Sequence, residues 1–273
     1  DAFDDWIAQT QLPGLLPETS VEVRDRAGVL LRAYTVEDGR WRLGLIPDQV
    51  DQRYLDMLVA YEDKRFYQHK GVDGWAVLRA AKQALTSGKV VSGASTLTMQ
   101  VARLLEQSGT GAWNGKLRQI RVAMRLEQVL SKQDILRLYL TLAPFGGNIE
   151  GVRAASLSYF GKEPKELDVQ ESAMLVGMLK NSSYFNPLRR EKLVRQRRNV
   201  VLKQMNRNEF ITLQEKDSLQ KYTREDAIEE KEQDQSFIDA TQNELIARAD
   251  AETTRILRGP LPDAWVTYHN YYK

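Results

Sequence analysis

Residues 47–71 read PDQVDQRYLDMLVAYEDKRFYQHKG, and this stretch decides how the chain folds and where its chemistry lies. Apolar and aromatic side chains recur every three or four residues over Val50–Tyr61, which predicts an amphipathic helix that ends close to Glu62. Two carboxylates, Glu62-Asp63, follow, and aromatic side chains and His69 come directly after them. Adjacent carboxylates in a partly apolar setting can differ in pKa, which allows one to act as a general base or acid near neutral pH. A helix end with ordinary surface charges is the alternative interpretation.

The residues before this stretch follow the pattern of strands, and those after it follow the pattern of helices. From Ser20 to Leu45 apolar and polar residues alternate around a turn candidate at 25–28, which predicts a small antiparallel β element. Loops rich in glycine and serine separate the later segments. The predicted helices cover Pro47 to Glu62 and then about Gly74–Thr86, Ser95–Glu106, Lys116–Leu130, Lys132–Leu142, Ile149–Tyr159, Val169–Lys180 and Arg189–Asn206. The sequence therefore predicts a mainly α fold with a short N-terminal β element.

Three parts are expected along the chain. Residues 1–46 form a β-rich lead-in, and residues 47–222 form the main helical domain. The acidic run Glu225–Glu232 marks a solvated helix or linker, so residues 223–273 are expected to be a separate segment without an assigned role.

Composition excludes several classes of site. The chain of 273 residues carries 39 basic and 37 acidic side chains, so its net charge of +2 gives no global attraction to nucleic acid. The absence of cysteine excludes disulfides, thiolate zinc sites and cysteine nucleophiles, and with only two histidines a multi-histidine metal site is impossible. The apolar runs are too short to span a bilayer and no signal peptide opens the chain, so we expect a trimmed ectodomain.

A glycine-rich segment, Gly93–Gln100, leads into a helix whose first turn carries hydroxyl side chains. Ser95 or Thr96 can cap this helix, and free N–H groups at a helix N-terminus also attract a phosphate or sugar oxygen. An ordinary capping sequence without a ligand is the alternative.

Cations follow this segment on the same helix and the next. They are Arg103, Lys116, Arg118, Arg121 and Arg125. The last three recur at i, i+3 and i+7, so they share one face, while apolar residues occupy another stripe. Arginines so placed can bind phosphate with paired, charge-assisted hydrogen bonds, or they can form a solvated face. Nucleic acid is disfavoured because no stacking aromatic side chains interleave with these cations.

Together these segments resemble the family 51 glycosyltransferases, the domains that polymerise lipid II in class A penicillin-binding proteins and monofunctional transglycosylases. Residues 62–71 match the motif Glu-Asp-x-x-Phe-x-x-His-x-Gly in every fixed position, and residues 93–100 match Gly-x-Ser-Thr-x-Thr-Gln-Gln except at Met99. Similar runs continue at Ser131–Leu136, Tyr139-Leu140, Pro144–Gly147, Gly151-Val152, Ala154-Ala155, Tyr159–Lys162, Glu171–Pro187 and Arg197–Leu202. The resemblance covers about Val21 to Met205.

One motif departs from the family. Its pattern Arg-Lys-x-x-Glu falls on Gly115–Gln119, which leaves Gln119 where a second carboxylate is usual and Gly115 where an arginine is usual. Gln119 cannot act as a base. Together with Met99, this substitution resembles the C-type branch of class A penicillin-binding proteins.

The resemblance implies a lysozyme-like fold with a large lobe and a smaller membrane-facing jaw. It implies that Glu62 is the catalytic base and that Gln119 occupies the second catalytic position. The substrate-binding residues that it implies are Asp63, Phe66, His69, Gly71, Ser95, Thr96, Thr98, Gln100, Arg103, Lys116, Arg118 and Arg125. A loosely bound Mg²⁺ or Mn²⁺ is the expected cofactor, and its ligands are left unassigned.

The implied reaction joins a growing glycan to lipid II with inversion and release of undecaprenyl pyrophosphate, on the extracytoplasmic face of the membrane. An anchor before Asp1 and other cell-wall synthesis proteins are expected, and nucleic acid is not. The jaw is expected within Trp75–Val91. Its helix either rests on the membrane or packs on the core. A lysozyme-like hydrolase and an inactive lipid II-binding module are the alternative functions. A transpeptidase domain is not expected, because Ser218–Lys221 lacks its partner motifs.

Overall fold

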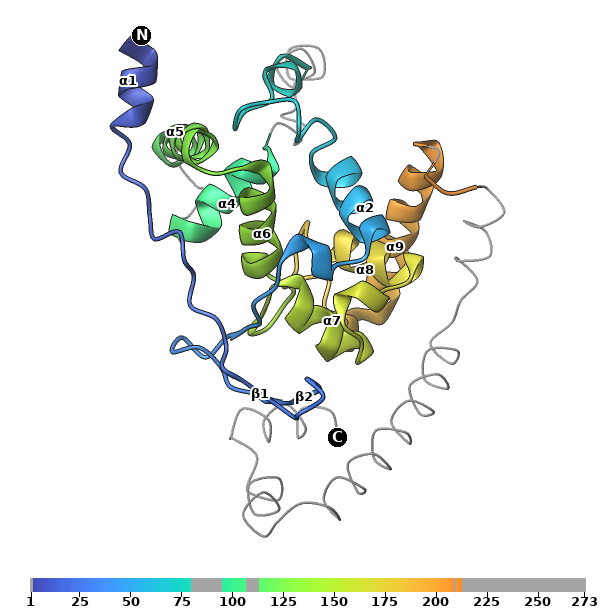
Figure 1. Ribbon diagram of the computed structural model, residues 1–273. Helices are drawn as coiled ribbons and strands as arrows, with labels where there is room; N and C mark the ends of the chain where they lie inside the picture. The colour runs from blue at the N-terminus through green and yellow to red at the C-terminus, as the bar shows by residue number, and fades with distance from the viewer. Residues whose placement is uncertain (1, 80–94, 107–112, 209, 213–273) are drawn as a thin grey trace, which may run out of the picture. The chain divides into compact units, whose positions relative to one another are not determined.

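The computed structural model describes residues 2–79, 95–106, 113–208 and 210–212 (Figure 1). All of them belong to one unit, Asp1–Gln220. The predicted segment 223–273 and most of the predicted jaw, including Ala81 and Leu85, lie outside the described residues.

The N-terminal part begins with helix α1 (Ala2–Ala8), which the sequence analysis did not predict. Strands β1 (Glu22–Arg24) and β2 (Leu30–Ala33) then pair antiparallel. The Asp25 side chain accepts hydrogen bonds from the N–H groups of Ala27 and Val29, and Gly28 adopts a φ of 84°, which closes the turn. The predicted antiparallel element is therefore confirmed over these residues.

The second half of that predicted element is wrong. Strand β3 (Trp41–Arg42) pairs in parallel with β4 (Ile149–Glu150), more than a hundred residues further along the chain. Residues 149–150 had been predicted as the start of a helix. Because Gly151 has a φ of 85° and its position is crowded by the carbonyl oxygens of α6, the helix starts at Val152, three residues later than predicted.

The rest of the described chain is helical, which confirms the predicted mainly α class. A short 3₁₀ helix η1 (Pro47–Gln49) is separated from α2 by Val50 and Asp51, so the single helix predicted from Pro47 is wrong. Asp51 caps the new start by accepting from the Arg53 N–H. The helices are α2 (Gln52–Glu62), α4 (Leu97–Glu106), α5 (Trp113–Val129), α6 (Lys132–Leu142), α7 (Val152–Phe160), η2 (Pro164–Glu166), α8 (Val169–Met178) and α9 (Pro187–Arg207).

Two groups of helices share one hydrophobic core. Helix α4 packs against α5 and α6, and α2 packs against α8 and α9, as Figure 1 shows. Leu58 of α2, Leu97 of α4 and Leu175 of α8 are fully buried in this core. The arrangement places the end of α2 beside the start of α4, which is where the two motifs noted in the sequence meet.

No helix among the described residues combines the length and the apolar character that crossing a bilayer requires. Residues 74–79 begin a helix that Asp73 caps by accepting from the N–H groups of Trp75 and Ala76. Trp75 and Leu78 are 68% and 63% exposed, whereas Ala76 is buried. In these residues the large apolar side chains therefore face outward rather than into the core.

Candidate active site

The candidate site is built around Glu62, the last residue of α2. Its Oε2 accepts a hydrogen bond of 3.1 Å from Nε2 of Gln100 on α4. The hydroxyl of Tyr139 lies 3.4 Å from Oε1 of the same glutamine, which fixes the orientation of the amide. Two residues that the sequence assigned to the site, Glu62 and Gln100, are thus brought together from separate motifs.

The surroundings of Glu62 favour its protonated form. Burial raises the pKa of Glu62, and the nearby charge of Asp63 adds to this effect. The hydrogen bond from Gln100 and the charges of Arg197 and Lys180 oppose it without cancelling it. A carboxylate with a raised pKa holds a proton more strongly, so Glu62 is suited to act as a general base.

Asp63 has a different task from that of its neighbour. Its carboxylate accepts from Nε2 of His69 at 3.0 and 3.1 Å and from the N–H of Leu97 at 2.8 Å. Both side chains are almost completely buried. Asp63 therefore binds the end of its own motif and the first turn of α4. Contact between a substrate and Asp63 or His69 stays a prediction.

The hydroxyls of the second motif are also engaged by the protein. Thr96 donates to the carbonyl of Gly71 at 2.6 Å and accepts from the Met99 N–H, so it caps α4. Thr98 donates to Glu127 at 2.6 Å. These contacts hold the two motifs together, and substrate binding by Thr96 and Thr98 stays a prediction.

Lys132, which the site prediction did not include, links the two motifs. Lys132 donates to the carbonyl of His69 and to Glu127, both at 2.7 Å, and its ammonium lies 4.5 Å from the centre of the Phe66 ring. Phe66 is itself fully buried. Since Glu127 also binds Thr98, one ion pair supports both motifs.

The backbone geometry at Gly71 shows why this residue has no side chain. Its φ is 91°, and a Cβ there would lie 2.9 Å from the backbone of Ala123 and Met124 in α5. Gly71 is therefore a packing position that allows the first motif to approach α5.

The predicted basic cluster is only partly assembled. Lys116 donates to Ser95 at 2.8 Å, and burial together with the charge of Arg103 lowers the pKa of Lys116. Arg118 is held by Glu106. We call Arg103, Lys116 and Arg118 the basic cluster. Arg125 instead contacts Gln128 on its own helix, near the opposite end of α5.

Arg121 shared a predicted face with Arg118 and Arg125, yet it serves the N-terminal helix. It donates to the carbonyl of Trp6, and its guanidinium stacks 4.4 Å from the centre of the Trp6 ring. A phosphate-binding role for this arginine would have to displace that contact.

Gln119 lies on the buried face of α5, which it shares with Val122, Ala123 and Leu126. Its side chain is 3% exposed, and Nε2 has no hydrogen-bond partner among the described residues. Neighbours at i and i+1 on a helix point in different directions, so Gln119 and Arg118 face different surroundings. Its assignment to the second catalytic position stays a prediction.

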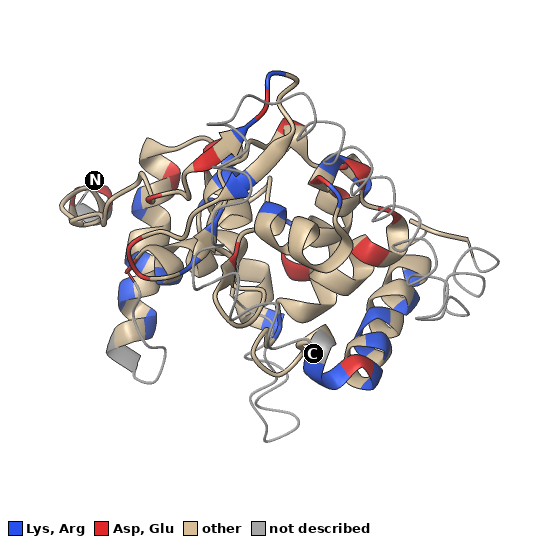
Figure 2. Ribbon diagram, turned by 90° about the horizontal axis from the view of Figure 1, so that it is seen from below, with Lys and Arg blue, Asp and Glu red and all other residues tan. Residues whose placement is uncertain are grey.

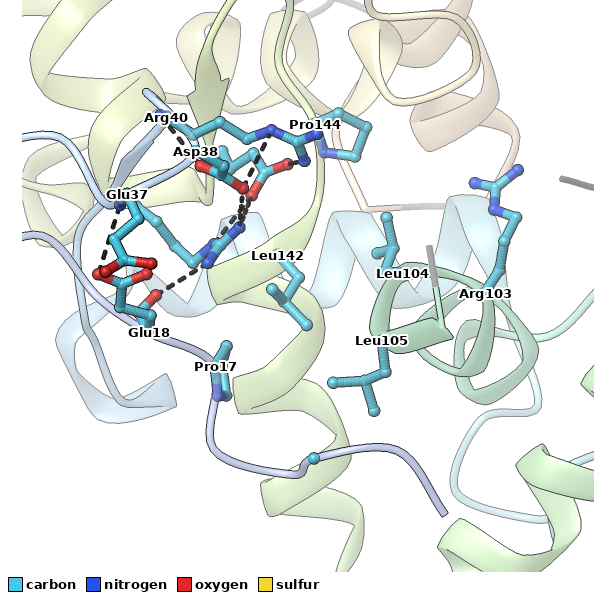
Figure 3. A pocket seen from close by; sticks show the side chains of 13 residues that line it. Pro17, Glu18, Glu37, Asp38, Arg40, Arg103, Leu104, Leu105, Leu142 and Pro144 are labelled. Atoms are coloured by element: carbon cyan, nitrogen blue, oxygen red, sulfur yellow. Dashed lines mark hydrogen bonds and ion pairs between the residues drawn. The ribbon is translucent and has the colours of Figure 1, made fainter. Parts of the chain in front are cut away.

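A cavity of about 620 Å³ lies next to the C-terminal part of α4, and Arg103 is one of the residues that line it (Figure 3). The opposite wall carries a cluster of paired charges, in which Arg42 binds Glu150 at 2.6 and 2.9 Å and Arg40 binds the same carboxylate. Arg103, in contrast, forms no ion pair with any described residue. Among the described residues that line this cavity, Arg103 is therefore the cation without an ion pair.

The site prediction missed two cations, Lys180 and Arg197, whose charges act on Glu62. Lys180 follows α8, and Arg197 lies on α9, a helix rich in arginine and lysine (Figure 2). Arg197 also donates to the carbonyl of Gly177 and stacks near the Tyr61 ring. Both residues fall in segments that resemble the family, which was the available signal.

The donor groups do not form a metal site. In the part of the chain that the structure describes, no three aspartate, glutamate or histidine side chains gather in a way that holds an ion. Asp63 is already occupied by His69 and Leu97, and position 119 offers an amide. Among the described residues, the side chains therefore do not fit a metal ion held by the protein alone.

A partly buried carboxylate at a helix end, whose pKa burial raises and on which the charges of Arg197 and Lys180 act, is suited to acid–base chemistry. Comparison with known proteins identifies the family of the chain. A sequence model described as Transglycosylase matches residues 29–206, and the chain belongs to this family.

Individual proteins are also similar to this chain. Penicillin-binding protein 1C of Escherichia coli (strain K12) is 46% identical over 178 residues, covering 65% of this chain and 23% of that protein. Penicillin-binding protein 1A of Vibrio cholerae is 36% identical over 201 residues, covering 74% and 24%. Penicillin-binding protein 1A of Escherichia coli (strain K12) is 40% identical over 187 residues, covering 68% and 22%. The chain thus spans less than a quarter of the length of these relatives.

Proposed function

We propose that this chain is a peptidoglycan glycosyltransferase that polymerises lipid II into β-1,4-linked glycan. The main observation that supports this proposal is the hydrogen bond from Gln100 to Glu62. It joins a base with a raised pKa to α4, the helix that also carries Arg103 of the basic cluster. Membership of the transglycosylase family supports the same reaction.

In the proposed mechanism Glu62 accepts the proton of the 4-hydroxyl of the incoming glucosamine. The hydroxyl oxygen forms a bond to the anomeric carbon of the growing chain. The bond from that carbon to the lipid pyrophosphate breaks on the opposite face, and the electron pair leaves with the phosphate. Attack from the opposite face inverts an α-linked donor into a β-linked product. General-base catalysis of this kind contributes about 10²- to 10⁴-fold in rate.

The basic cluster stabilises the leaving group in this mechanism. Negative charge develops on the pyrophosphate as the bond breaks, and fixed cations stabilise that charge in a site from which water is excluded. Arg103 is available, and Lys116 lies beside it. Hydrolysis of finished glycan, the lysozyme-like alternative, has no use for these cations.

A divalent cation enters this proposal only with the substrate. Mg²⁺ or Mn²⁺ bound by the pyrophosphate oxygens would neutralise part of their charge. The described side chains provide no ligand set for such an ion, so the steps above are assigned to residues of this chain, and the ion would act only by neutralising charge on the pyrophosphate.

We place the reaction on the extracytoplasmic face of the membrane, where the substrate's lipid is embedded. The outward-facing Trp75 and Leu78 support contact between the jaw and the membrane surface. Contacts with other cell-wall synthesis proteins belong to the same proposal.

The test is polymerisation of labelled lipid II by the purified chain with Mg²⁺, with lysozyme-sensitive polymer as the readout. Glu62→Gln retains size and hydrogen bonding but cannot accept the proton, so kcat is expected to fall at least ~10²-fold with lipid II affinity nearly unchanged. Glu191→Gln, which removes an exposed ion pair with Arg195 on α9, is the matched control. Binding of lipid II without any polymer from the unsubstituted chain would refute the proposed function and favour a binding module.

A further inference from the structure

Arg118 of the basic cluster is held by a carboxylate from another helix. Its Nε and Nη2 lie 2.7 and 2.6 Å from Oε1 of Glu106, the last residue of α4. The Glu106 side chain is only 8% exposed. Its second oxygen, Oε2, is buried without a hydrogen-bond partner among the described residues. Leaving a carboxylate oxygen buried and unpaired is costly, so it calls for an explanation.

We propose that Glu106 is the carboxylate that positions Arg118 for the departing pyrophosphate. The inference rests on the proposed function and adds a residue to it. Gln119 is the next residue on the same helix as Arg118 and lies on the buried face of that helix, so it faces different surroundings. The contact to Arg118 comes instead from α4.

The position of Glu106 on α4 fits this role. Gln100, Arg103 and Glu106 recur every three residues, so each is a neighbour of the next along a row that turns gradually around the helix. At 1.5 Å per residue they extend about 9 Å from the residue that binds Glu62. Glu106 thus lies at the outer end of the strip that begins at the catalytic base.

Electrostatics explains why a carboxylate is useful there. Burial lowers the pKa of Lys116, and the charge of Arg103 adds to this effect. Arg118 adds a third cation, and its side chain is 59% exposed. An exposed arginine samples many rotamers, whereas a hydrogen bond and a second ionic contact to one carboxylate oxygen restrict the guanidinium. A fixed donor stabilises developing charge without reorganising during the reaction.

The test is a double-mutant cycle of Glu106→Gln and Arg118→Ala in the lipid II polymerisation assay. Loss of one charged positioning contact is expected to lower kcat about 10-fold for Glu106→Gln, with KM changing less than about 3-fold. If Glu106 acts through Arg118, Glu106→Gln has no further effect in the Arg118→Ala background. Glu106→Asp should recover part of the rate, and Glu191→Gln should leave it unchanged.

Affinity for inorganic pyrophosphate, measured by calorimetry in the same variants, gives a readout that does not depend on turnover. Glu106→Gln should weaken it about as much as it lowers kcat, with an unchanged melting temperature. Tighter binding or faster turnover would mean that Glu106 masks Arg118, which overturns the proposal. An additive cycle also overturns it. If the unsubstituted chain makes no polymer, the proposed function fails, and the calorimetric cycle alone decides for or against Glu106.

Discussion

The ion pair between Lys132 and Glu127, which links the two motifs, allows a prediction of how much stability its loss would cost. Lys132→Met removes the ammonium that binds both the carbonyl of His69 and the carboxylate of Glu127 at 2.7 Å. Methionine keeps the length and the apolar stem that packs near Phe66. What remains is a Glu127 side chain that is 6% exposed and keeps only its bond from Thr98.

The cost is set by the charge that is left unpaired. Removing one partner of a fully buried pair costs about 3–5 kcal/mol. Lys132 is 22% exposed, so water screens part of this interaction, and we expect the free energy of unfolding to fall by about 2 kcal/mol. For a domain of this size that lowers Tm by roughly 4–8 °C.

Glu127→Gln supplies the second arm of the cycle and keeps an acceptor for Thr98. Once the carboxylate is neutral, losing the lysine matters less, so the double variant should be more stable than the sum of the single effects predicts, by about 1 kcal/mol. Urea unfolding of the four proteins measures this difference. Additive effects within about 0.5 kcal/mol would refute the view that this pair supports the site.

Three further predictions concern pH, backbone space and metal. Burial raises the pKa of Glu62, and the hydrogen bond from Gln100 lowers it. The ratio kcat/KM should therefore fall as pH drops through that raised pKa, and Gln100→Leu should shift this fall to higher pH. If the pH at which kcat/KM falls does not move, Glu62 is excluded as the base. Gly71→Ala should destabilise the fold by more than about 3 kcal/mol, whereas Gly28→Ala, which also has a positive φ but open space, should cost only about 1 kcal/mol in urea unfolding. Removal of divalent metal with EDTA should slow polymerisation without lowering Tm, since the described side chains hold no ion; a lower Tm would show a protein-bound metal.

What the sequence could predict was local. Helical periodicity placed α6 at its observed bounds, Lys132–Leu142, and the turn at 25–28 was found because aspartate and glycine have strong local preferences. Residues 62–71 and 93–100 were identified as neighbours in function because two motifs occurred in order. The structure shows the bond from Gln100 to Glu62 that joins them.

What the sequence could not predict depends on partners far apart in the chain. Strand β3 pairs with a segment that looks helical until the backbone of Gly151 is known. The arginine face on α5 was correctly periodic, yet its members have unrelated partners: Arg118 binds Glu106, and Arg121 binds Trp6. Periodicity gives the face of a helix but not what lies opposite it. A residue's role in a cluster of charges therefore has to be taken from contacts.

Asp63 shows the same distinction between the two adjacent carboxylates, and it gives the last prediction. The sequence alone leaves Asp63 as the alternative base if Glu62 is dispensable. In the structure its oxygens accept from His69 and from the Leu97 N–H, and its side chain is almost completely buried.

Asp63→Ala should therefore damage the fold more than the chemistry. It leaves a buried N–H and a buried imidazole N–H without acceptors, each costing about 1–3 kcal/mol, so unfolding free energy should fall by roughly 2–5 kcal/mol. Asp63→Asn keeps an acceptor for Leu97 and should recover much of this loss. If Asp63 supports the site without accepting the substrate proton, then Asp63→Asn, assayed well below its Tm, retains most of its kcat while Glu62→Gln does not. Equal losses of kcat in folded Asp63→Asn and Glu62→Gln would instead give both carboxylates a part in proton transfer.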